Sequence, residues 1–425
     1  MAKLVQGGEA PCDPKRVSYR ENGLSLPCML NVAQRITEIN ESETLAMTKL
    51  ARELKEAGND VISLSIGEPD FDTPEHIGAA AIQAIKEGHT HYTPVLGFQD
   101  FRESICRKLQ RENGLSYQPS EIIVSTGAKH TLVNIMLSVL NPGDEVIIPA
   151  PYWVSYPAMV RYAGGVPVFL NTTVDNDYKP TPEQLRASIT PKTKIFLFSS
   201  PCNPSGTVFQ PADLESYAAV LREFPDILVV SDEIYEHIIF EGSHMSIASL
   251  PGFRERTAVV NGLSKGYAMT GWRIGYMAGP QRLVKACEKL QGVFTSGANS
   301  IAQKAGIAAL DGTMEPTQHM REVFRNRRNL VLAELSKILG LKLNIPEGAF
   351  YVFPDVSHFI GKSYQGKQIT DSSALAIYLL NEALVATVAG DAFGMPECIR
   401  LSYATDEASL MKACSRMKEA LEKLS

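Results

Sequence analysis

The sequence predicts an α/β fold in which a mainly parallel sheet of about seven strands has helices on both faces, with a smaller α+β domain beside it. The main observation is that short apolar runs alternate with amphipathic helical patterns between about residues 120 and 280. Apolar strands separated by helical crossovers are typical of a sheet that is buried on both faces. A second observation is the change after Pro280, where the pattern is mostly helical to about residue 339. The predicted strands are residues 121–124, 145–148, 166–170, 194–198, 227–230, 258–260 and 274–278.

The chain before this sheet predicts an arm, a helix and a short strand. Residues 1–31 contain several Gly and Pro with little periodicity, which indicates an N-terminal arm or extension. The apolar spacing of residues 45–54 predicts a helix that ends at Gly58, and residues 61–66 predict a short buried strand. The order Thr-Pro-Glu at residues 73–75 then predicts a second helix, with Thr73 as its cap.

The C-terminal part predicts a second, smaller core. Its elements are strands at 349–353, 385–388 and 399–402 and a final helix near 406–423. Because one helix and one strand cannot close a core alone, we expect the segment before Gly67 to pack with this part. The predicted domains are an arm of residues 1–31, a small domain of residues 32–74 and 331–425, and a large domain of residues 75–330.

The composition favours a cytoplasmic protein that binds neither nucleic acid nor membranes. The 425 residues carry a formal net charge of −6, so no global basic field attracts a phosphate backbone or an anionic membrane. The seven cysteines include no Cys-x-x-Cys pair, which indicates free thiols. No uncharged apolar run approaches the roughly 20 residues of a membrane helix. The N-terminal region also lacks the basic-then-apolar order of a signal peptide.

Polar side chains follow several predicted strands, at the sheet edge where open α/β sheets bind ligands. Asp232 and Tyr235 come after residues 227–230, which places a carboxylate and a phenol three positions apart. Asn203 comes after residues 194–198, in a turn rich in Pro and Gly. Taken alone, the first feature is better explained by a helix cap or a surface ion pair, and the second by an ordinary turn.

The segment after residues 258–260 favours a functional site over ordinary caps and turns. Lys265 lies among small residues and Arg273 follows eight positions later. This suits an amine nucleophile beside a cationic anchor for a phosphate. The alternatives are a solvated lysine or a Gly-x-x-x-Gly helix contact within residues 271–279, but Arg273 argues against membrane packing.

Two further features point to an anionic cofactor with an aromatic ring. Gly127 and Ala128 follow the strand at 121–124 and open a helix, so their backbone N–H groups and the helix dipole can hold a phosphate. Trp153 follows the strand at 145–148 and offers an indole for stacking, although a lone tryptophan more often belongs to a core. Neither a Walker loop nor a Gly-x-Gly-x-x-Gly motif occurs, which disfavours nucleotide hydrolysis and nicotinamide chemistry.

Arg400 lies in the middle of the apolar strand at 399–402. Burying a guanidinium is costly unless an anion pairs with it, so an incoming carboxylate is a candidate ligand. The eight histidines form no His-x-x-x-His pair with a flanking acid, and the serines form no Gly-x-Ser-x-Gly elbow. The sequence therefore predicts neither a metal site nor a serine hydrolase.

Together these segments resemble the class I aminotransferases of the fold-type I pyridoxal 5′-phosphate enzymes, from about residue 32 onward. The most specific motif joins Gly-Leu-Ser-Lys at residues 262–265 to Arg-Ile-Gly at residues 273–275. The resemblance implies a homodimer with shared active sites. The subgroup that looks most similar is the aspartate/prephenate aminotransferases, through residues 67–74, 150–156 and 268–273.

The resemblance also implies pyridoxal 5′-phosphate as the cofactor and assigns its contacts. Lys265 would form the internal aldimine and move the proton between the substrate Cα and the cofactor. Asp232 would keep the ring nitrogen protonated, while Asn203 and Tyr235 would hydrogen-bond the ring oxygen and Trp153 would stack on the ring. The phosphate would be held by Arg273, Gly127, Ala128, Ser264 and, across the dimer interface, Tyr92 of the partner subunit.

For the substrate, the resemblance implies that Arg400 grips the α-carboxylate, supported by the backbone of Gly67. Trp153 and Asn203 would contact the substrate as well as the cofactor. The candidate readers of the substrate's distal group are Lys129 and Thr44.

Two positions depart from relatives. Gly262 stands where many relatives carry a phosphate-binding Ser, which leaves Ser264 or Thr126 to compensate. Asn40 stands where some subgroup members carry a Lys.

The predicted function is transfer of an amino group between aspartate or glutamate and 2-oxo acids in a ping-pong cycle. The expected acceptors are oxaloacetate, 2-oxoglutarate and prephenate, which would give arogenate. The alternatives on the same fold are an aromatic aminotransferase and a carbon–sulfur β-lyase. A non-catalytic regulator with this fold is disfavoured because no basic helix-turn-helix segment precedes residue 32.

Overall fold

The structure, a computed structural model, describes Ala33, Ile36 and residues 43–425. The chain divides into two compact units, Met1–Asn40 and Glu41–Ser425. The helices and strands named below belong to the second unit. The predicted arm of residues 1–31 and the departure at Asn40 lie outside the described residues.

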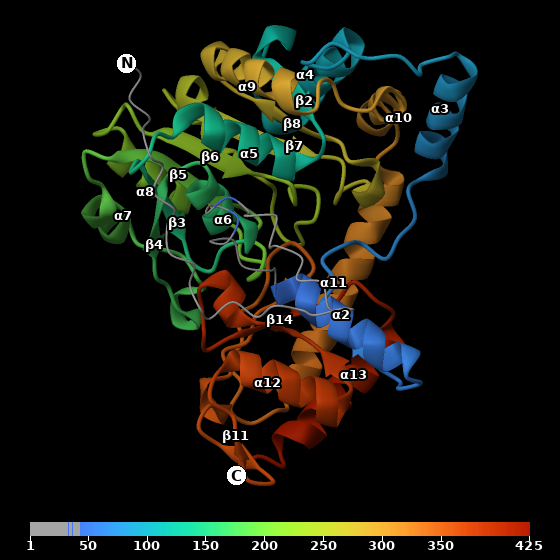
Figure 1. Cartoon of the computed structure of the whole chain (residues 1–425), viewed down its shortest axis with the longest axis vertical. Helices are drawn as coiled ribbons and strands as arrows, with labels where there is room; N and C mark the ends of the chain where they lie inside the picture. The colour runs from blue at the N-terminus through green and yellow to red at the C-terminus, as the bar shows by residue number, and fades with distance from the viewer. Residues whose placement is uncertain (1–32, 34–35, 37–42) are drawn as a thin grey trace, which may run out of the picture. The chain divides into compact units, whose positions relative to one another are not determined.

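The centre of this unit is a seven-stranded sheet with the order β2-β8-β7-β6-β5-β3-β4 (Figure 1). Each predicted apolar run forms one of its strands, with slightly shifted ends, so the predicted sheet is confirmed. All neighbouring strands are parallel except β8, which is antiparallel to β2 and β7. The strands are β2 (Ile122–Ser125), β3 (Glu145–Pro149), β4 (Val166–Leu170), β5 (Thr193–Ser199), β6 (Leu228–Asp232), β7 (Thr257–Gly262) and β8 (Gly275–Ala278).

Strand β8 begins where its two neighbours end. Its first residue, Gly275, pairs with Ser125 at the end of β2 and with Gly262 at the end of β7. The start of β8 therefore lies at the same edge of the sheet as the C-terminal ends of the parallel strands. The polar residues that follow or precede these strand ends are thereby brought to one edge.

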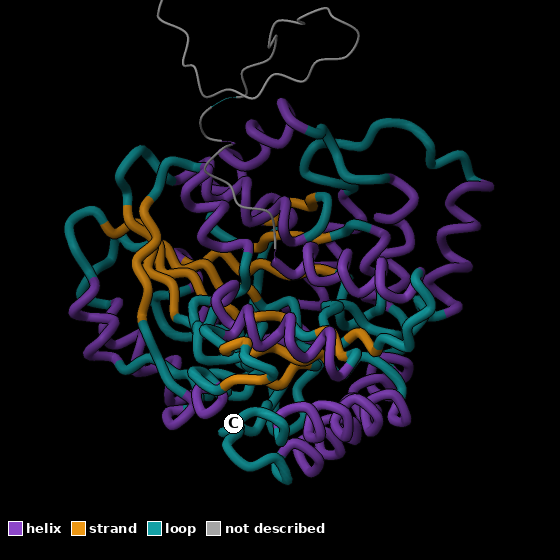
Figure 2. Tube along the Cα trace, turned by 60° about the horizontal axis from the view of Figure 1, so that its bottom comes forward, coloured by secondary structure: helices purple, strands orange, loops and turns teal. Residues whose placement is uncertain are grey.

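Helices cover both faces of the sheet (Figure 2). Alternate strand residues face opposite helical layers: Ile123 packs with one set of helices, and Ile122 and Val124 pack with another. This explains why the strands are apolar throughout rather than alternating. One layer contains α5 (Ala128–Val139), α6 (Ser155–Tyr162) and α9 (Gln281–Phe294). The other contains α3 (Glu75–Lys86), α4 (Gln99–Asn113), α10 (Ser300–Asp311), α7 (Pro182–Ser188) and α8 (Pro211–Leu221).

The predicted cap of α3 was wrong. The helix begins at Glu75 with Pro74 at its N-cap position, and no side chain caps it. Thr73 Oγ1 instead donates to the carbonyl oxygen of Ala268 at 2.8 Å and accepts from Nε1 of Trp272 at 2.9 Å. The Thr73 hydroxyl forms these hydrogen bonds because the segment before α3 packs against the loop that follows β7.

The N-terminal and C-terminal parts of this unit pack together, as predicted. Strand β1 pairs in parallel with β12, and Met47 and Ala51 of α2 share an apolar cluster with Ala376 and Leu380. Strands β13, β14 and β9 form an antiparallel sheet beside them. The division into a small domain of residues 32–74 and 331–425 and a large domain of residues 75–330 stays a prediction.

The long helix α11 runs from beside the large sheet toward the C-terminal elements (Figure 1). The helices of this part are α2 (Glu43–Glu56), α11 (Glu315–Leu335), α12 (Ser372–Tyr378), continued by a π-helix (Leu379–Ala383), and α13 (Glu407–Leu421). Its strands are β1 (Ile62–Ser63), β9 (Tyr351–Val352), β10 (Ser363–Tyr364), β11 (Lys367–Gln368), β12 (Val385–Ala386), β13 (Val388–Ala389) and β14 (Ile399–Ser402).

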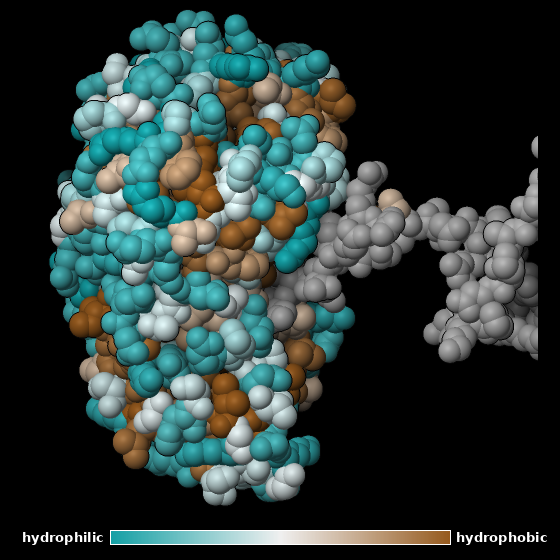
Figure 3. Space-filling model, turned by 90° about the vertical axis from the view of Figure 1, so that its left-hand side faces the viewer, coloured by the Kyte–Doolittle hydropathy of each residue, from teal (hydrophilic) through white to brown (hydrophobic). Residues whose placement is uncertain are grey.

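The face drawn in Figure 3 is mainly hydrophilic, with hydrophobic side chains in small patches. Within the described part of the chain, no helix has the length and apolar character needed to cross a bilayer. The cysteines at 106, 202, 287, 398 and 414, which are those that the structure describes, are all free thiols, as predicted.

Candidate active site

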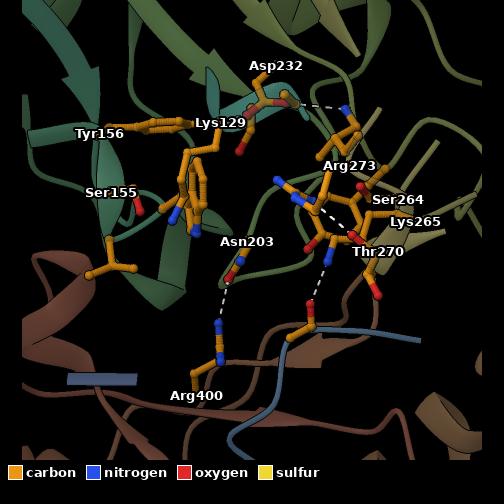
Figure 4. Close-up of a pocket in the computed structure, with 17 residues that line it drawn as sticks. Lys129, Ser155, Tyr156, Asn203, Asp232, Ser264, Lys265, Thr270, Arg273 and Arg400 are labelled. Atoms are coloured by element: carbon orange, nitrogen blue, oxygen red, sulfur yellow. Dashed lines mark hydrogen bonds between the residues drawn. The ribbon is translucent and has the colours of Figure 1, made fainter. Parts of the chain in front are cut away.

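The predicted site residues meet in a cavity of about 390 Å³ at the C-terminal edge of the large sheet (Figure 4). Strand β6 ends at Asp232, and the loops after β5 and β7 bring in Asn203 and Lys265. Arg400 comes from the middle of β14. The predicted residues that line the cavity are Gly67, Ala128, Lys129, Trp153, Asn203, Asp232, Tyr235, Ser264, Lys265, Arg273 and Arg400.

Lys265 presents its amine to the cavity. Its Nζ donates a hydrogen bond to the backbone oxygen of Gly67 at 2.5 Å. Burial lowers the pKa of Lys265 to about 8, and the charges of Arg400 and Arg273 act in the same direction. The amine is therefore more readily neutral, and more nucleophilic, than that of a solvated lysine.

Asp232 is a buried carboxylate that the cavity exposes to a ligand. Its Oδ2 accepts a hydrogen bond from the hydroxyl of Tyr156 at 2.7 Å. Burial raises the pKa of Asp232 to about 6, although the Tyr156 hydrogen bond and the charge of Lys265 oppose that rise. A cationic group bound next to Asp232 would stabilise its ionised form.

One end of the cavity is built to hold an anion. Helix α5 begins at Ala128, and its N-cap residue Gly127 has a φ of 80°. A Cβ at Gly127 would collide with the guanidinium of Arg273, so only glycine lets that cation approach the helix N-terminus. The hydroxyls of Ser264 and Thr270 lie in the same lining. Backbone N–H groups, a helix dipole and a guanidinium together favour a phosphate.

Thr126 does not contribute to this anion-binding end of the cavity. Its side chain is exposed and is absent from the cavity lining, and its N–H donates to Nδ1 of His130 at 3.2 Å. Of the two residues expected to compensate for Gly262, only Ser264 lines the cavity.

Arg400 is 2% exposed and has no carboxylate at its guanidinium in the part of the chain that the structure describes. Its Nη1 donates to Oδ1 of Asn203 at 3.0 Å, and its Nη2 donates to the backbone oxygen of Ser65 at 2.6 Å. The Nε atom is buried without a hydrogen-bond partner. Because a buried guanidinium is costly without an anion, this geometry fits the predicted carboxylate ligand.

Two aromatic side chains connect Arg400 to the strand exit of β6. The guanidinium lies 4.6 Å from the centre of the Tyr351 ring, and the Tyr351 hydroxyl is 2.8 Å from that of Tyr235. A Cβ at Gly67 would come within 2.8 Å of the same Tyr351 hydroxyl. The cavity wall is therefore tightly packed on the side where Gly67 faces Lys265.

The charges that line the cavity are unbalanced. The described lining residues include four cations, namely Lys129, Lys265, Arg273 and Arg400, and Asp232 is the acidic one among them. Lys129 lies over the ring of Trp153, with its Nζ 4.8 Å from the ring centre. Such a cavity favours ligands that carry more than one negative charge.

Three predicted residues are not among the described residues that line this cavity, namely Gly127, Tyr92 and Thr44. Tyr92 is 98% exposed and does not line it. Thr44 lies at the start of α2, and its side chain is outside the described residues.

Among the residues of the cavity or its wall that sequence reasoning missed are Tyr156, Thr270 and Tyr351. Tyr156 and Thr270 each stand three positions from a predicted residue, Trp153 and Arg273, so their spacing could have suggested them. Tyr351 sits in an apolar strand and carries no comparable signal.

The family model of aminotransferases of class I and II matches residues 59–417. The chain belongs to this family. It is 48% identical over 393 residues to an aspartate/prephenate aminotransferase of Cereibacter sphaeroides, covering 92% of this chain and 98% of the relative. It is 47% identical over 399 residues to a bifunctional aspartate aminotransferase and glutamate/aspartate-prephenate aminotransferase of Petunia hybrida, covering 92% and 83% of the two chains.

Among solved structures, this aminotransferase is similar to the aspartate aminotransferase of Thermus thermophilus with maleate. The TM-score is 0.87 at 42% identity, and the match covers 92% of this chain and 100% of the other. Family and architecture together confirm the predicted fold-type I class.

Proposed function

We propose that this aminotransferase exchanges the amino group of aspartate or glutamate with 2-oxo acids in a ping-pong cycle, using pyridoxal 5′-phosphate. The observation that carries the proposal is the excess of four cations over one carboxylate around the cavity. One cation is the reacting amine, and three remain for three anions. A phosphate, an α-carboxylate and a distal carboxylate would use all three. Prephenate is a proposed acceptor because the two curated relatives are named for it.

The residues at the two ends of the cavity fit this cofactor. Asp232 is a buried carboxylate that would pair with a cationic ring nitrogen, and such a partner would offset the burial that raises its pKa. Arg273, Gly127 with Ala128, and Ser264 would hold its phosphate. When bound, pyridoxal phosphate supplies an electron sink for the negative charge left on the substrate Cα.

Trp153, Asn203 and Tyr235 would hold the ring between these ends. Trp153 lines the cavity beside Lys129 and presents an aromatic face for stacking. Asn203 and Tyr235 line the same cavity and would donate hydrogen bonds to the ring oxygen. Their present partners, Arg400 and Tyr351, keep both side chains oriented.

Lys265 would move the proton between the substrate Cα and the cofactor. With a pKa of about 8, roughly one amine in ten is neutral at pH 7. The backbone oxygen of Gly67 holds the Nζ atom at the cavity wall. This places the base beside the position where Arg400 would orient the substrate.

Arg400 and Lys129 would read the two ends of a dicarboxylate. Arg400 has an unpartnered Nε and would bind the α-carboxylate through paired N–H groups. Lys129 is the cation left for the distal carboxylate, with Thr44 as its proposed helper. The Thermus thermophilus structure holds maleate, which is itself a dicarboxylate.

A homodimer with shared sites is part of the proposal. Tyr92 is 98% exposed, so its side chain does not pack in the core of its own subunit and is free to contact a partner. Tyr92 of the partner subunit would complete the phosphate cradle. The proposed location is the cytoplasm, with neither nucleic acid nor membrane as a partner.

The first test is the absorption spectrum of the purified protein before and after glutamate, followed by prephenate. We expect a visible band from the bound cofactor that glutamate removes and prephenate restores. Recovery only with oxaloacetate or aromatic 2-oxo acids would replace prephenate with that acceptor. Release of pyruvate from cystathionine would support the β-lyase alternative, and the absence of any band would contradict the proposal.

A second expected result concerns the hydroxyl that contacts Asp232. Tyr156→Phe should raise the pKa of Asp232 further, because the lost hydrogen bond favours the ionised form. Asp232 would then protonate at a higher pH as the solution is acidified. The acid limb of the kcat/KM profile for glutamate should therefore move to higher pH.

The matched control is Tyr217→Phe. Its buried hydroxyl donates to the backbone oxygen of Pro180 at 2.8 Å and does not line the cavity. This control should leave the acid limb in place. An unmoved limb in Tyr156→Phe would show that this hydroxyl does not tune Asp232.

A further inference from the structure

The turn after β6 faces the cavity on one side and a buried polar cluster on the other. Asp232 and Tyr235 line the cavity, whereas Glu233 and Glu236 are buried and do not line it. The N–H of Glu236 donates to the backbone oxygen of Glu233 at 2.9 Å, which closes the turn. The two catalytic-side residues are thus held in place by neighbours that never meet the ligand.

Glu236 is the centre of that cluster. The ammonium of Lys108, a fully buried residue of α4, contacts Oε1 of Glu236. Asn261 Nδ2 donates to the same oxygen at 2.6 Å, and Asn113 Nδ2 donates to Oε2 at 2.9 Å. Three donors therefore share two carboxylate oxygens, an arrangement that an amide with one acceptor oxygen cannot reproduce.

Asn261 carries this contact to the loop of Lys265. It lies near the end of β7, four positions before Lys265, and its Oδ1 accepts the N–H of Gly262 at 2.7 Å. The Asn261 amide is therefore bound to Glu236 on one side and to the loop backbone on the other. A shift of Glu236 would be passed directly to the start of the Lys265 loop.

His237 makes a second contact on the other side of Lys265. A Cβ at Gly266 would come within 2.5 Å of Nδ1 of His237, so this ring lies directly on the backbone after Lys265. His237 Nε2 is itself fixed by Oε2 of Glu112 at 2.9 Å. The backbone on both sides of Lys265 thus rests on groups that belong to or adjoin Glu236.

We propose that the side chain of Glu236, held by Lys108 and two asparagines, is a positioning element that fixes Tyr235 and Lys265 relative to each other from behind the cavity. The inference rests on the proposed function, because it concerns the geometry of that reaction. Neither Lys108 nor Glu236 lines the cavity, so they act only through the two loops that they join. The pair is fully buried, which makes its geometry well defined.

The same cluster has the residue types of a metal site. Ligand atoms of Glu112, Glu236 and His237 lie within 4.8 Å of one another. The ammonium of Lys108, however, is 3.5 Å from Oε2 of Glu112 and also contacts Glu236. The chain itself fills the cation position between these carboxylates, which favours an ion-pair clamp over a metal ion.

The substitution Glu236→Gln tests this positioning role. The change removes one acceptor and leaves the buried Lys108 ammonium with the more distant carboxylate of Glu112, 3.5 Å away. We expect kcat per folded molecule to fall by about 10²-fold, as small misplacements of catalytic groups do. KM for glutamate should change little, since Arg400 and Lys129 are held elsewhere. The pH at which the visible absorption of the bound cofactor changes should shift, because Tyr235 and Lys265 both move.

The double variant Lys108→Met with Glu236→Gln separates positioning from charge. Without the ammonium, the Asn113 amide can turn so that its oxygen accepts from the new amide, and Asn261 keeps an acceptor. We expect this variant to regain most of the lost kcat and the wild-type absorption titration. Circular dichroism and urea unfolding of the cofactor-free proteins give the folded fraction for each comparison.

Lys179→Met is the matched control, because it removes a partly buried ion pair with Asp213 that lies outside the cavity lining. It should leave kcat and the titration unchanged. A folded Glu236→Gln enzyme with wild-type kcat and titration would show that the pair serves stability alone and would overturn the proposal. A folded double variant as impaired as Glu236→Gln would overturn it too. Failure of the proposed function is seen separately, as a wild-type spectrum that glutamate does not change.

Discussion

Replacing Lys265 by alanine is expected to abolish both half-reactions while the protein remains folded. The side chain makes one hydrogen bond, to Gly67, and its amine faces the cavity, so its loss removes little packing. Without it, covalent attachment of the cofactor would lack its amine, and proton transfer at the substrate Cα would lack its base. Acid–base catalysis alone contributes about 10²- to 10⁴-fold, so the loss of turnover should exceed roughly 10³-fold.

The measurement is single-turnover kinetics of each half-reaction, together with circular dichroism of the purified variant. Lys192→Ala, which removes an exposed lysine outside the cavity lining, should behave as the wild type. Substantial turnover by Lys265→Ala, with glutamate or with aspartate, would be incompatible with its assigned role. A variant that fails to fold would be recognised by its circular dichroism.

Replacing Arg400 by alanine should raise KM for every amino acid alike. Arg400 is the buried cation nearest to the proposed α-carboxylate, and all amino acids share that group. Truncating one partner of a buried, hydrogen-bonded charge pair costs about 2 to 5 kcal/mol, which corresponds to a loss of roughly 30-fold to several thousand-fold in kcat/KM. The measurement is kcat/KM for aspartate, glutamate and phenylalanine.

Lys129→Met provides the contrast. It should weaken aspartate and glutamate but spare phenylalanine, because only the dicarboxylates present a second anion. If Arg400→Ala affected the dicarboxylates alone, the two roles would have to be exchanged. Equal effects of both variants on all three substrates would remove Lys129 as the distal reader.

Much of the site could be predicted because its residues come directly after strand ends. Apolar runs indicate where a strand stops, and the loops after parallel strands meet at the carboxyl edge of the sheet. Asp232, Asn203 and Lys265 were placed at this edge in this way, while their roles came from the family resemblance, and the structure brings the three residues together. Arg400 stood out for a different reason, since a charged residue inside an apolar strand needs an explanation.

The residues that were missed depend on contacts between distant segments. Tyr351 contacts Tyr235 only because β9 packs beside the turn after β6. No pattern in the sequence around Tyr351 predicts that contact. Thr73 was wrongly predicted as a helix cap. Its hydroxyl instead forms hydrogen bonds with Ala268 and Trp272, nearly two hundred positions away.

Lys108 escaped notice for a third reason. A lysine on an amphipathic helix normally indicates a solvated position, whereas this one is fully buried against Glu236. The sequence offers no sign that an ion pair, rather than an apolar contact, fills that part of the core.

The antiparallel strand β8 has a consequence for how the site can vary. Because Gly262 and Gly275 are paired, the segment that carries both Lys265 and Arg273 is a loop whose two ends are fastened to each other. An insertion or deletion within this loop would lengthen or shorten the span between amine and guanidinium without breaking a strand pairing. The distance from nucleophile to phosphate anchor is therefore set by this loop rather than by the strand pairing, and its variation is limited by Leu263, Tyr267 and Met269, which are buried in the core.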